Sequence, residues 1–178
     1  MEKECTEYRK FVWQLNNLLK NKVNNKKIYI LCIGTISIKG DSFGPKVGSM
    51  LKSKIGYKDN IKILGDYETN ISYHELKKVS KEFERNIVDK YIIAIDATLS
   101  EEYNIGKIFV SNKGIKYGEA LKKNNTYIGD ISIKGIVGKN KNNRIKNYNE
   151  LKNSSDIVIE KLVKIVSNGI AEVVQNMY

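Results

Sequence analysis

Apolar residues follow two alternating patterns along the chain, and these patterns predict helices and strands in turn. Residues 6–20 carry apolar side chains three and four positions apart, as an amphipathic helix does. The segments 28–33 and 91–95 are short continuous apolar runs, and the mainly apolar segment 61–64 is expected to be a further short strand. Such runs are typical of strands that are buried on both faces of a parallel sheet. We therefore expect a sheet that helices cover on both sides.

Helical spacing returns between and after these runs. Pro45 lies where a helix is expected to begin, and Gly56 lies where that helix is expected to end. Ser72 and Glu75 have the spacing of a capping box, so a second helix is expected to begin there. A long apolar stripe over residues 155–176 predicts a further helix at the end of the chain.

The stretch between the third run and the last helix is less regular. Residues 105–110 alternate weakly and predict a strand, and residues 127–137 predict another. Residues 138–153 lack an apolar period and predict a solvated loop, which is densely basic from Lys139 to Arg144. The order of elements predicts a single domain over residues 1–178, an α/β sandwich with a largely parallel sheet.

Composition narrows the classes of function. The chain has 31 Lys and Arg residues against 20 Asp and Glu residues, a net charge of +11. A basic surface can bind polyanions, but only three of these basic residues are arginines and no base-reading motif is present, so nucleic acid is not the partner that we favour. No stretch approaches the roughly 20 apolar residues of a membrane span, and the first residues lack the pattern of a basic run followed by an apolar run, so a secretory leader is not expected. We therefore expect a cytoplasmic protein without a membrane partner.

Two acidic residues lie at the expected ends of buried strands. Asp41 lies in the glycine-containing segment Gly40–Pro45 after the first strand, and Asp96 follows the third strand. The carboxyl ends of parallel strands share one edge of a sheet, where ligands usually bind, so the two carboxylates can converge. The alternative is that Asp41 caps the following helix and Asp96 caps a turn. The spacing alone leaves both interpretations open.

A close carboxylate pair has two chemical uses. One carboxyl group can keep a proton while the other activates water against a carbonyl group, or both can ligate a divalent metal. Other nucleophilic or basic groups are less suited to catalysis. His74, the single histidine, is expected to be an exposed residue in the first turn of a helix. Cys32 is expected to be buried in a strand, where a thiol is a poor nucleophile.

Four segments of the chain, taken together, resemble the YyaC sporulation protein family. They occur in the order and spacing of that family, and they are Cys32–Thr35, Gly40–Gly48, Tyr91–Ala97 and Gly129–Val137. The family is similar to the spore germination protease and to the hydrogenase maturation peptidases. The resemblance implies a three-layer α/β/α sandwich of the phosphorylase/hydrolase-like type with a mostly parallel central sheet.

The resemblance also implies a function and a site. It implies a sporulation-associated peptidase in the cytoplasm of a sporulating cell, which hydrolyses a protein or peptide, such as a spore protein, with Asp41 and Asp96. In the hydrogenase peptidases two carboxylates and a later histidine bind nickel. No histidine follows Asp96 in this chain, which favours a site that requires no cofactor, with a divalent metal on Asp41 and Asp96 as the alternative.

Four residues beside the pair are expected to contact substrate: Gly40, Gly44, Thr98 and Asp130. Asp130 is also a candidate to complete the site. The chain departs from the family at residues 36–39, which are more apolar, and at residues 114–124, where Lys and Asn replace a glycine-rich loop. A different function stays open on the same fold, that of a non-catalytic regulatory module that binds a peptide or a metal. The first helix could cover the sheet or pair with a second subunit in a homodimer.

Overall fold

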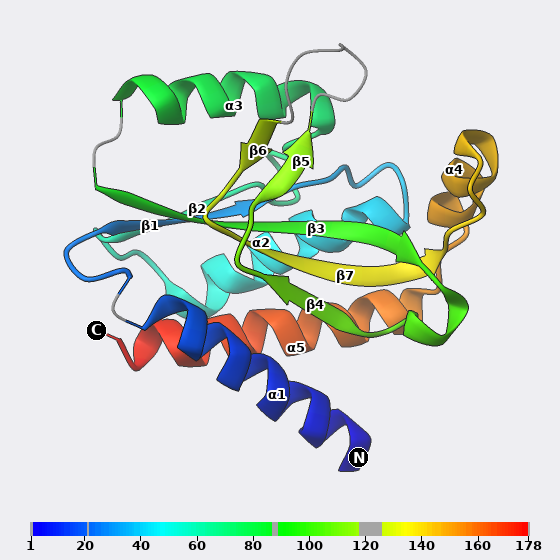
Figure 1. The fold of residues 1–178 in the computed structure, drawn as a ribbon, viewed down its shortest axis with the longest axis horizontal. Helices are drawn as coiled ribbons and strands as arrows, with labels where there is room; N and C mark the ends of the chain where they lie inside the picture. Colours follow the sequence, from blue (N-terminus) through cyan, green and yellow to red (C-terminus); the bar gives the residue numbers. More distant parts are fainter. Residues whose placement is uncertain (1, 21, 87–88, 118–125, 178) are drawn as a thin grey trace.

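The computed structural model describes residues 2–20, 22–86, 89–117 and 126–177 and contains a five-stranded sheet between layers of helices (Figure 1). The strand order is β2-β1-β3-β7-β4. The four strands from β2 to β7 pair in parallel, and β4 pairs antiparallel with β7 at the edge. The strands are β1 (Lys27–Cys32), β2 (Ile61–Leu64), β3 (Lys90–Ser100), β4 (Ile108–Ser111) and β7 (Ile131–Lys139). The mostly parallel sheet and the three-layer fold are therefore confirmed.

The two faces of the sheet carry different elements (Figure 1). One face is covered by the helices α1 (Glu2–Leu19), α2 (Phe43–Ile55) and α5 (Asp156–Gln175). The other face is covered by the helix α3 (Tyr73–Asn86) and by an antiparallel pair of short strands, β5 (Ile115–Tyr117) and β6 (Thr126–Ile128). A short helix, α4 (Arg144–Lys152), lies beside the carboxyl ends of β3 and β7.

Strand β1 explains why the chain forms a two-sided core. Its side chains alternate between the faces, so Ile28 and Ile30 join the core under α1, α2 and α5. Tyr29 and Leu31 join the core under α3. All four side chains are buried, which confirms that the first apolar run is a strand covered on both faces.

Helix α1 packs against its own chain. Its apolar stripe buries Phe11, Leu15 and Leu19, and the helix contacts α5 and β4. The ring of Phe11 lies against Gly169 of α5, where an added Cβ would come within 2.7 Å of it. The first helix therefore covers the helical layer of its own molecule, and a homodimer stays a prediction.

We expect Leu15→Ala to lower the free energy of unfolding by about 2–5 kcal/mol, because it leaves a cavity between α1 and α5. Trp13 on the same helix is 67% exposed and makes a matched control. Trp13→Ala is expected to change that free energy by less than about 0.5 kcal/mol. Urea unfolding measures both variants, and equal effects would contradict this docking of α1.

The structure corrects the end of the third strand. The apolar run stops at Ile95, but β3 continues to Ser100 and stays paired with β7 as far as Lys139. Beyond Asp96 the apolar residues Ala97 and Leu99 alternate with polar ones, which is the pattern of a half-covered strand. Asp96 therefore lies inside β3 and does not cap a turn.

Two further expectations for the later part of the chain were wrong. Residues 127–137 are not one strand, because Gly129 has a φ angle of +99° and separates β6 from β7. The interval 138–153 is not a loop, because it contains the end of β7 and the helix α4. Asn143 caps α4 by accepting a hydrogen bond from the backbone N–H of Lys146 at 3.1 Å. Helix α4 buries none of its own residues, so no apolar stripe marked it in the sequence.

Helix α1 begins four residues earlier than expected, and β4 begins at Ile108 instead of residue 105, while the other boundaries agree with the sequence pattern to within two residues. Strand β2 has the predicted bounds, and Glu75 accepts hydrogen bonds from the backbone and hydroxyl of Ser72, as in a capping box. Helix α2 ends before Gly56 and begins at Phe43, so Pro45 lies within its first turn, where no N–H donor is needed.

Among the described residues, no helix is both long enough and apolar enough to cross a membrane.

Candidate carboxylate site

The candidate site lies at the edge of the sheet where β1 stops and β3 continues. The last residue of β1, Cys32, pairs with Ile95 of β3. Asp96 is therefore the first residue of β3 that extends past the end of β1. On its other side β3 remains paired with β7, in which Lys134 is the partner of Asp96. The sheet thus holds the backbone of Asp96 on one side and leaves a step on the other.

Asp41 reaches this step from the loop that follows β1. It lies in a single helical turn, η1 (Gly40–Ser42), which contacts β3. Its carboxylate oxygen Oδ2 accepts a hydrogen bond from the backbone N–H of Thr35 at 2.7 Å. The N-cap residue of α2 is Ser42, so Asp41 binds the loop and does not cap the helix. The helix-capping interpretation of Asp41 was wrong.

Close backbone contacts fix the position of η1. Gly34 has a φ angle of +139°, and an added Cβ would lie 2.0 Å from the carbonyl oxygen of Asp41. A Cβ at Gly44 would lie 2.0 Å from the carbonyl oxygen of Ile33. Residues with side chains would push η1 and the start of α2 away from the strand end. The glycines therefore hold the Asp41 backbone against β1.

Burial raises the pKa values of both carboxyl groups, and the charge of Asp41 adds to the increase at Asp96. Burial raises the pKa of Asp41, and the hydrogen bond from Thr35 opposes that increase. Asp96 retains a little accessible surface, but the protein around it and then the charge of Asp41 raise its pKa to about 7. The Lys134 ammonium group and the Ala97 N–H lower the pKa of Asp96 by less. Asp41 and Asp96 therefore interact electrostatically, and near neutral pH Asp96 exchanges a proton.

The structure places the four residues that were expected to contact substrate in different surroundings. Thr98 lies two residues beyond Asp96 on the same face of β3, so its role stays a prediction. Gly40 and Gly44 are buried. An added Cβ at Gly40 would lie 2.5 Å from Ser154 Oγ. Both glycines thus lie against protein atoms, and they allow the close packing of η1 and α2.

Asp130 lies away from the pair. Its Oδ2 accepts a hydrogen bond from the backbone N–H of Ile92 at 2.7 Å, at the amino end of β3. Ile92 precedes Asp96 by four residues, and a strand rises about 3.3 Å per residue, so Asp130 lies on the order of 13 Å from the site. Asp130 therefore does not complete the site, contrary to expectation.

The remaining sequence candidates have structural roles. His74 is exposed in the first turn of α3, as expected. Cys32 is fully buried, and that burial raises the pKa of its thiol, which confirms that it is a poor nucleophile. The departure at residues 114–124 lies largely outside the described residues.

Lys134 is the neighbour of the pair that the sequence did not indicate. It is partly buried in β7, directly across from Asp96. The signal was present, because polar residues alternate with apolar ones in Ser132, Ile133, Lys134 and Gly135. Sequence alone could not give the register between β3 and β7, which is what brings Lys134 to Asp96.

The donor set does not fit a zinc ion held by protein ligands alone. In the part of the chain that the structure describes, no group of three or more His, Cys, Asp or Glu side chains is placed to hold a metal ion. A zinc site usually takes three or four such ligands from the protein, whereas Mg²⁺ can be held by one or two carboxylates and water, so a divalent metal on Asp41 and Asp96 stays an alternative. The ammonium group of Lys134 lies close enough to act on Asp96 and would repel a cation. These residues suit proton exchange better than metal binding.

Comparisons with known proteins identify the family. Residues 2–169 match the family described as a protein of unknown function, DUF1256. The chain belongs to that family. It is also 25% identical, over 150 residues, to a protein of Bacillus subtilis (strain 168) described as an uncharacterized protein, YyaC. That match spans 84% of this chain and 71% of the relative. The resemblance to the YyaC family is therefore confirmed.

Solved structures with the same fold include two maturation enzymes of hydrogenases. One is a NiFe hydrogenase maturation protease, HycI, from Thermococcus kodakarensis KOD1, at 18% identity and a TM-score of 0.56. The match covers 90% of this chain and 98% of the other. The second is the hydrogenase maturating endopeptidase HybD from E. coli, at 10% identity and a TM-score of 0.52, over 85% of this chain and 93% of the other. At these identities the comparison shows a shared fold.

Proposed function

We propose that this protein is a peptidase that hydrolyses peptide bonds with the Asp41 and Asp96 carboxyl groups. The observation that carries the proposal is the place of Asp96 on β3, just past the end of β1, where the segment that carries Asp41 contacts β3 and the charge of Asp41 helps to raise the pKa of Asp96 to about 7. A pair of this kind holds one proton between two carboxyl groups at neutral pH, which supplies an acid and a base in one site. The fold shared with two peptidases supports the same proposal.

The surroundings assign the roles. Asp41 receives the Thr35 N–H, which stabilises its ionised form, so Asp41 is the base. Asp96 is the group whose pKa lies near neutrality, so Asp96 is the acid. Lys134 keeps the pKa of Asp96 from rising further, which leaves the proton exchangeable.

The chemistry balances with these two groups and one water molecule. The oxygen of the water molecule attacks the peptide carbonyl carbon while the Asp41 carboxylate takes a proton from that water. In the same step the Asp96 carboxyl group gives its proton to the carbonyl oxygen. The tetrahedral diol then collapses, one hydroxyl group returns a proton to Asp96, and Asp41 gives its proton to the departing amine. Each carboxyl group ends in its starting state.

The substrate that we propose is a protein or a peptide in a sporulating cell. The test is incubation of the full chain with a peptide library of known sequences and with proteins extracted from sporulating cells. Mass spectrometry then identifies newly formed chain ends. We expect new ends with the wild type and none with Asp41→Asn. The absence of new ends, together with peptide binding that depends on both carboxylates, would favour the non-catalytic binding module.

We expect hydrolysis to be independent of divalent metals, because the site offers two carboxylates beside a lysine. Turnover should change by less than about twofold when a chelator is added, whereas removal of a metal that carries the reaction costs several kcal/mol of transition-state stabilisation. The measurement is the initial rate with and without chelator. Loss of activity that added zinc or nickel restores would contradict the metal-free mechanism.

A further inference from the structure

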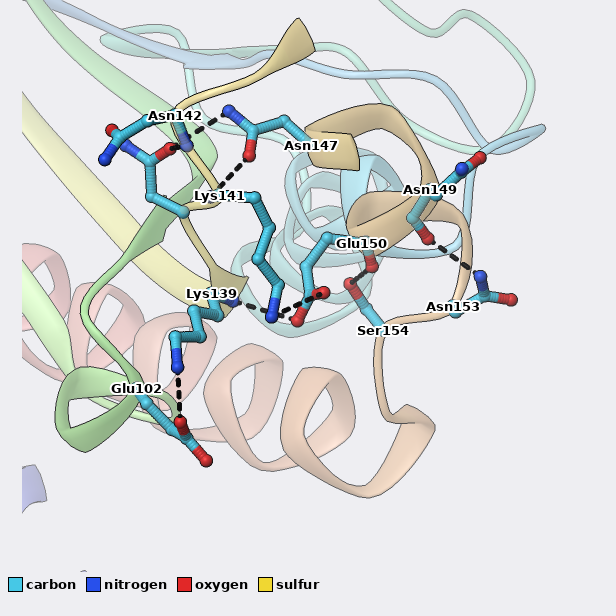
Figure 2. A network of polar contacts seen from close by, with 10 residues as sticks. Glu102, Lys139, Lys141, Asn142, Asn147, Asn149, Glu150, Asn153 and Ser154 are labelled. Atoms are coloured by element: carbon cyan, nitrogen blue, oxygen red, sulfur yellow. Dashed lines mark hydrogen bonds and ion pairs between the residues drawn. The ribbon is translucent and has the colours of Figure 1, made fainter. Parts of the chain in front are cut away.

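One face of helix α4 is hydrogen-bonded to the turn that follows β7, and the opposite face of the helix is exposed. Glu150 accepts a hydrogen bond from the backbone N–H of Lys139 at 3.1 Å, and Asn147 accepts one from Lys141 at 2.8 Å. Figure 2 shows Glu150 and Asn147 pointing from the helix toward the turn that follows β7. These contacts attach α4 to the end of the sheet without burying any of its residues.

The opposite face combines apolar and basic side chains. Arg144, Tyr148 and Lys152 are four residues apart and therefore share one side of the helix, and Ile145 adjoins Tyr148 at a spacing of three. Ile145 is 74% exposed and Tyr148 is 51% exposed. The two apolar side chains lie side by side and can both contact one partner segment, between the flanking cations. We call these four residues the α4 face.

The charge of this region is positive and unbalanced. The acidic residue of the helix, Glu150, is already engaged with the Lys139 N–H and lies 4.0 Å from the Lys141 ammonium group. Within the described ranges, Arg144, Lys146 and Lys152 form no ion pair. A partner that carries carboxylates would meet two of these unpaired cations, Arg144 and Lys152, on the α4 face and no unpaired acid on this helix.

The α4 face is joined to the carboxylate site through the backbone. The junction between α4 and α5 packs on Gly40, where an added Cβ would lie 2.9 Å from the Leu151 carbonyl oxygen. Gly40 directly precedes Asp41. Lys39, one residue earlier, forms an ion pair with Asp156 of α5 at 3.0 Å. A segment bound to α4 would therefore lie beside the edge that carries the carboxylate pair (Figure 1).

We infer that the α4 face binds an acidic, aromatic-containing segment of the polypeptide substrate and thereby presents the neighbouring peptide bond to Asp41 and Asp96. This inference rests on the proposed function for the presentation step, while the binding itself does not need catalysis. The side chains favour a polypeptide over a nucleic acid, because Ile145 and Tyr148 add apolar contacts between the cations. Carboxylates then pair with Arg144 and Lys152.

The test is fluorescence anisotropy with the full chain and a labelled, glutamate-rich copolymer of Glu and Tyr. We expect Arg144→Glu/Lys152→Glu to weaken binding by about tenfold or more, since each exposed pair changes from attraction to repulsion. The matched control is Lys77→Glu/Lys81→Glu on α3, which removes the same charge from another exposed helix face. The control is expected to weaken binding by less than about twofold, because screening limits distant charges.

Tyr148→Ser tests the apolar part of the surface. It is expected to weaken binding of the copolymer by about threefold to tenfold, from the loss of buried aromatic area. Tyr57→Ser is the control, because Tyr57 is 91% exposed on a different part of the chain. Asp41→Asn should bind as tightly as the wild type, which separates this inference from the failure of the peptidase mechanism.

Three outcomes would overturn the inference. Equal losses in the α4 and α3 charge variants would show that only the net charge of the protein attracts the copolymer. Binding of single-stranded oligo(dT) as tightly as the copolymer, with Tyr148→Ser unchanged, would show a general polyanion site. A wild-type protein that does not bind the copolymer at low salt would show that the α4 face has no acidic polypeptide partner.

Discussion

Asp41→Asn is expected to lower peptide turnover by about 10²–10⁴-fold, the usual contribution of a positioned acid or base. Asparagine can still accept the Thr35 hydrogen bond but cannot take a proton from water. The substitution also removes the negative charge of Asp41, which raises the pKa of Asp96 in the wild type. The variant should therefore fold with unchanged thermal stability or better, and kcat should fall while substrate binding remains.

Asp130→Asn is the matched control for this substitution. Asp130 lies at the amino end of the sheet, and its oxygen accepts a hydrogen bond from Ile92 that an amide oxygen can also accept. Turnover of this variant should stay within about twofold of the wild type, since most surface substitutions away from special features change stability little. Turnover by Asp41→Asn at the wild-type rate would refute the proposed base, and loss of activity in Asp130→Asn would mean that the site lies elsewhere.

The second large effect is expected in the pH dependence of stability. The pKa of Asp96 is raised in the folded protein, so between about pH 4 and pH 7 the folded state keeps a proton that the unfolded state has released. Stability must then fall as the pH rises through this window. The accumulated loss is about 2–4 kcal/mol. Asp96→Asn carries no such cost and should be more stable than the wild type by that amount at pH 8.

The comparison at low pH checks the cause. Below about pH 3 the carboxyl group of Asp96 is mostly neutral in both states, so the wild type and Asp96→Asn should have similar free energies of unfolding there. Urea unfolding across this pH range measures the difference, with the exposed residue Glu101 changed to Gln as a control for lost charge. A constant difference at every pH would mean that Asp96 does not exchange its proton in this window.

The carboxyl group of Asp66 determines how the free energy of unfolding changes at low pH. Burial alone would raise the pKa of Asp66, but hydrogen bonds from Lys52, Thr69 and Glu68 outweigh it and lower that pKa to about 2. Asp66 therefore contributes stability above its unfolded pKa, and that contribution is lost as the pH falls toward 2. The stability of the wild type should thus be highest between these two titrations.

Elements that bury an apolar pattern could be predicted from the sequence, and elements held by polar contacts could not. Strand β2 has its predicted bounds because its apolar residues pair with the apolar strand β1, whereas α4 was missed because Asn143, Asn147 and Glu150 hold it in place. The end of β3 was misplaced for a related reason. Its last residues are stabilised by pairing with β7, which is a long-range contact that no local pattern records.

The candidate site was predictable to the level of its two carboxylates. Strand-end positions and the family motifs both indicated Asp41 and Asp96, and the structure couples them electrostatically. The contribution of Lys134 depends on register, and the separation of Asp130 depends on which end of β7 it occupies. Neither can be read from spacing along the chain, because both are properties of strand pairing.

The sheet ends at both sides in strands of four residues, β2 and β4. Edge strands expose backbone groups to which a strand of another molecule can add, and short edges limit that reaction. Lys62 is exposed on β2, and α1 contacts β4. We therefore expect the folded protein to resist edge-to-edge aggregation, and variants that detach α1 to become prone to it before they unfold completely.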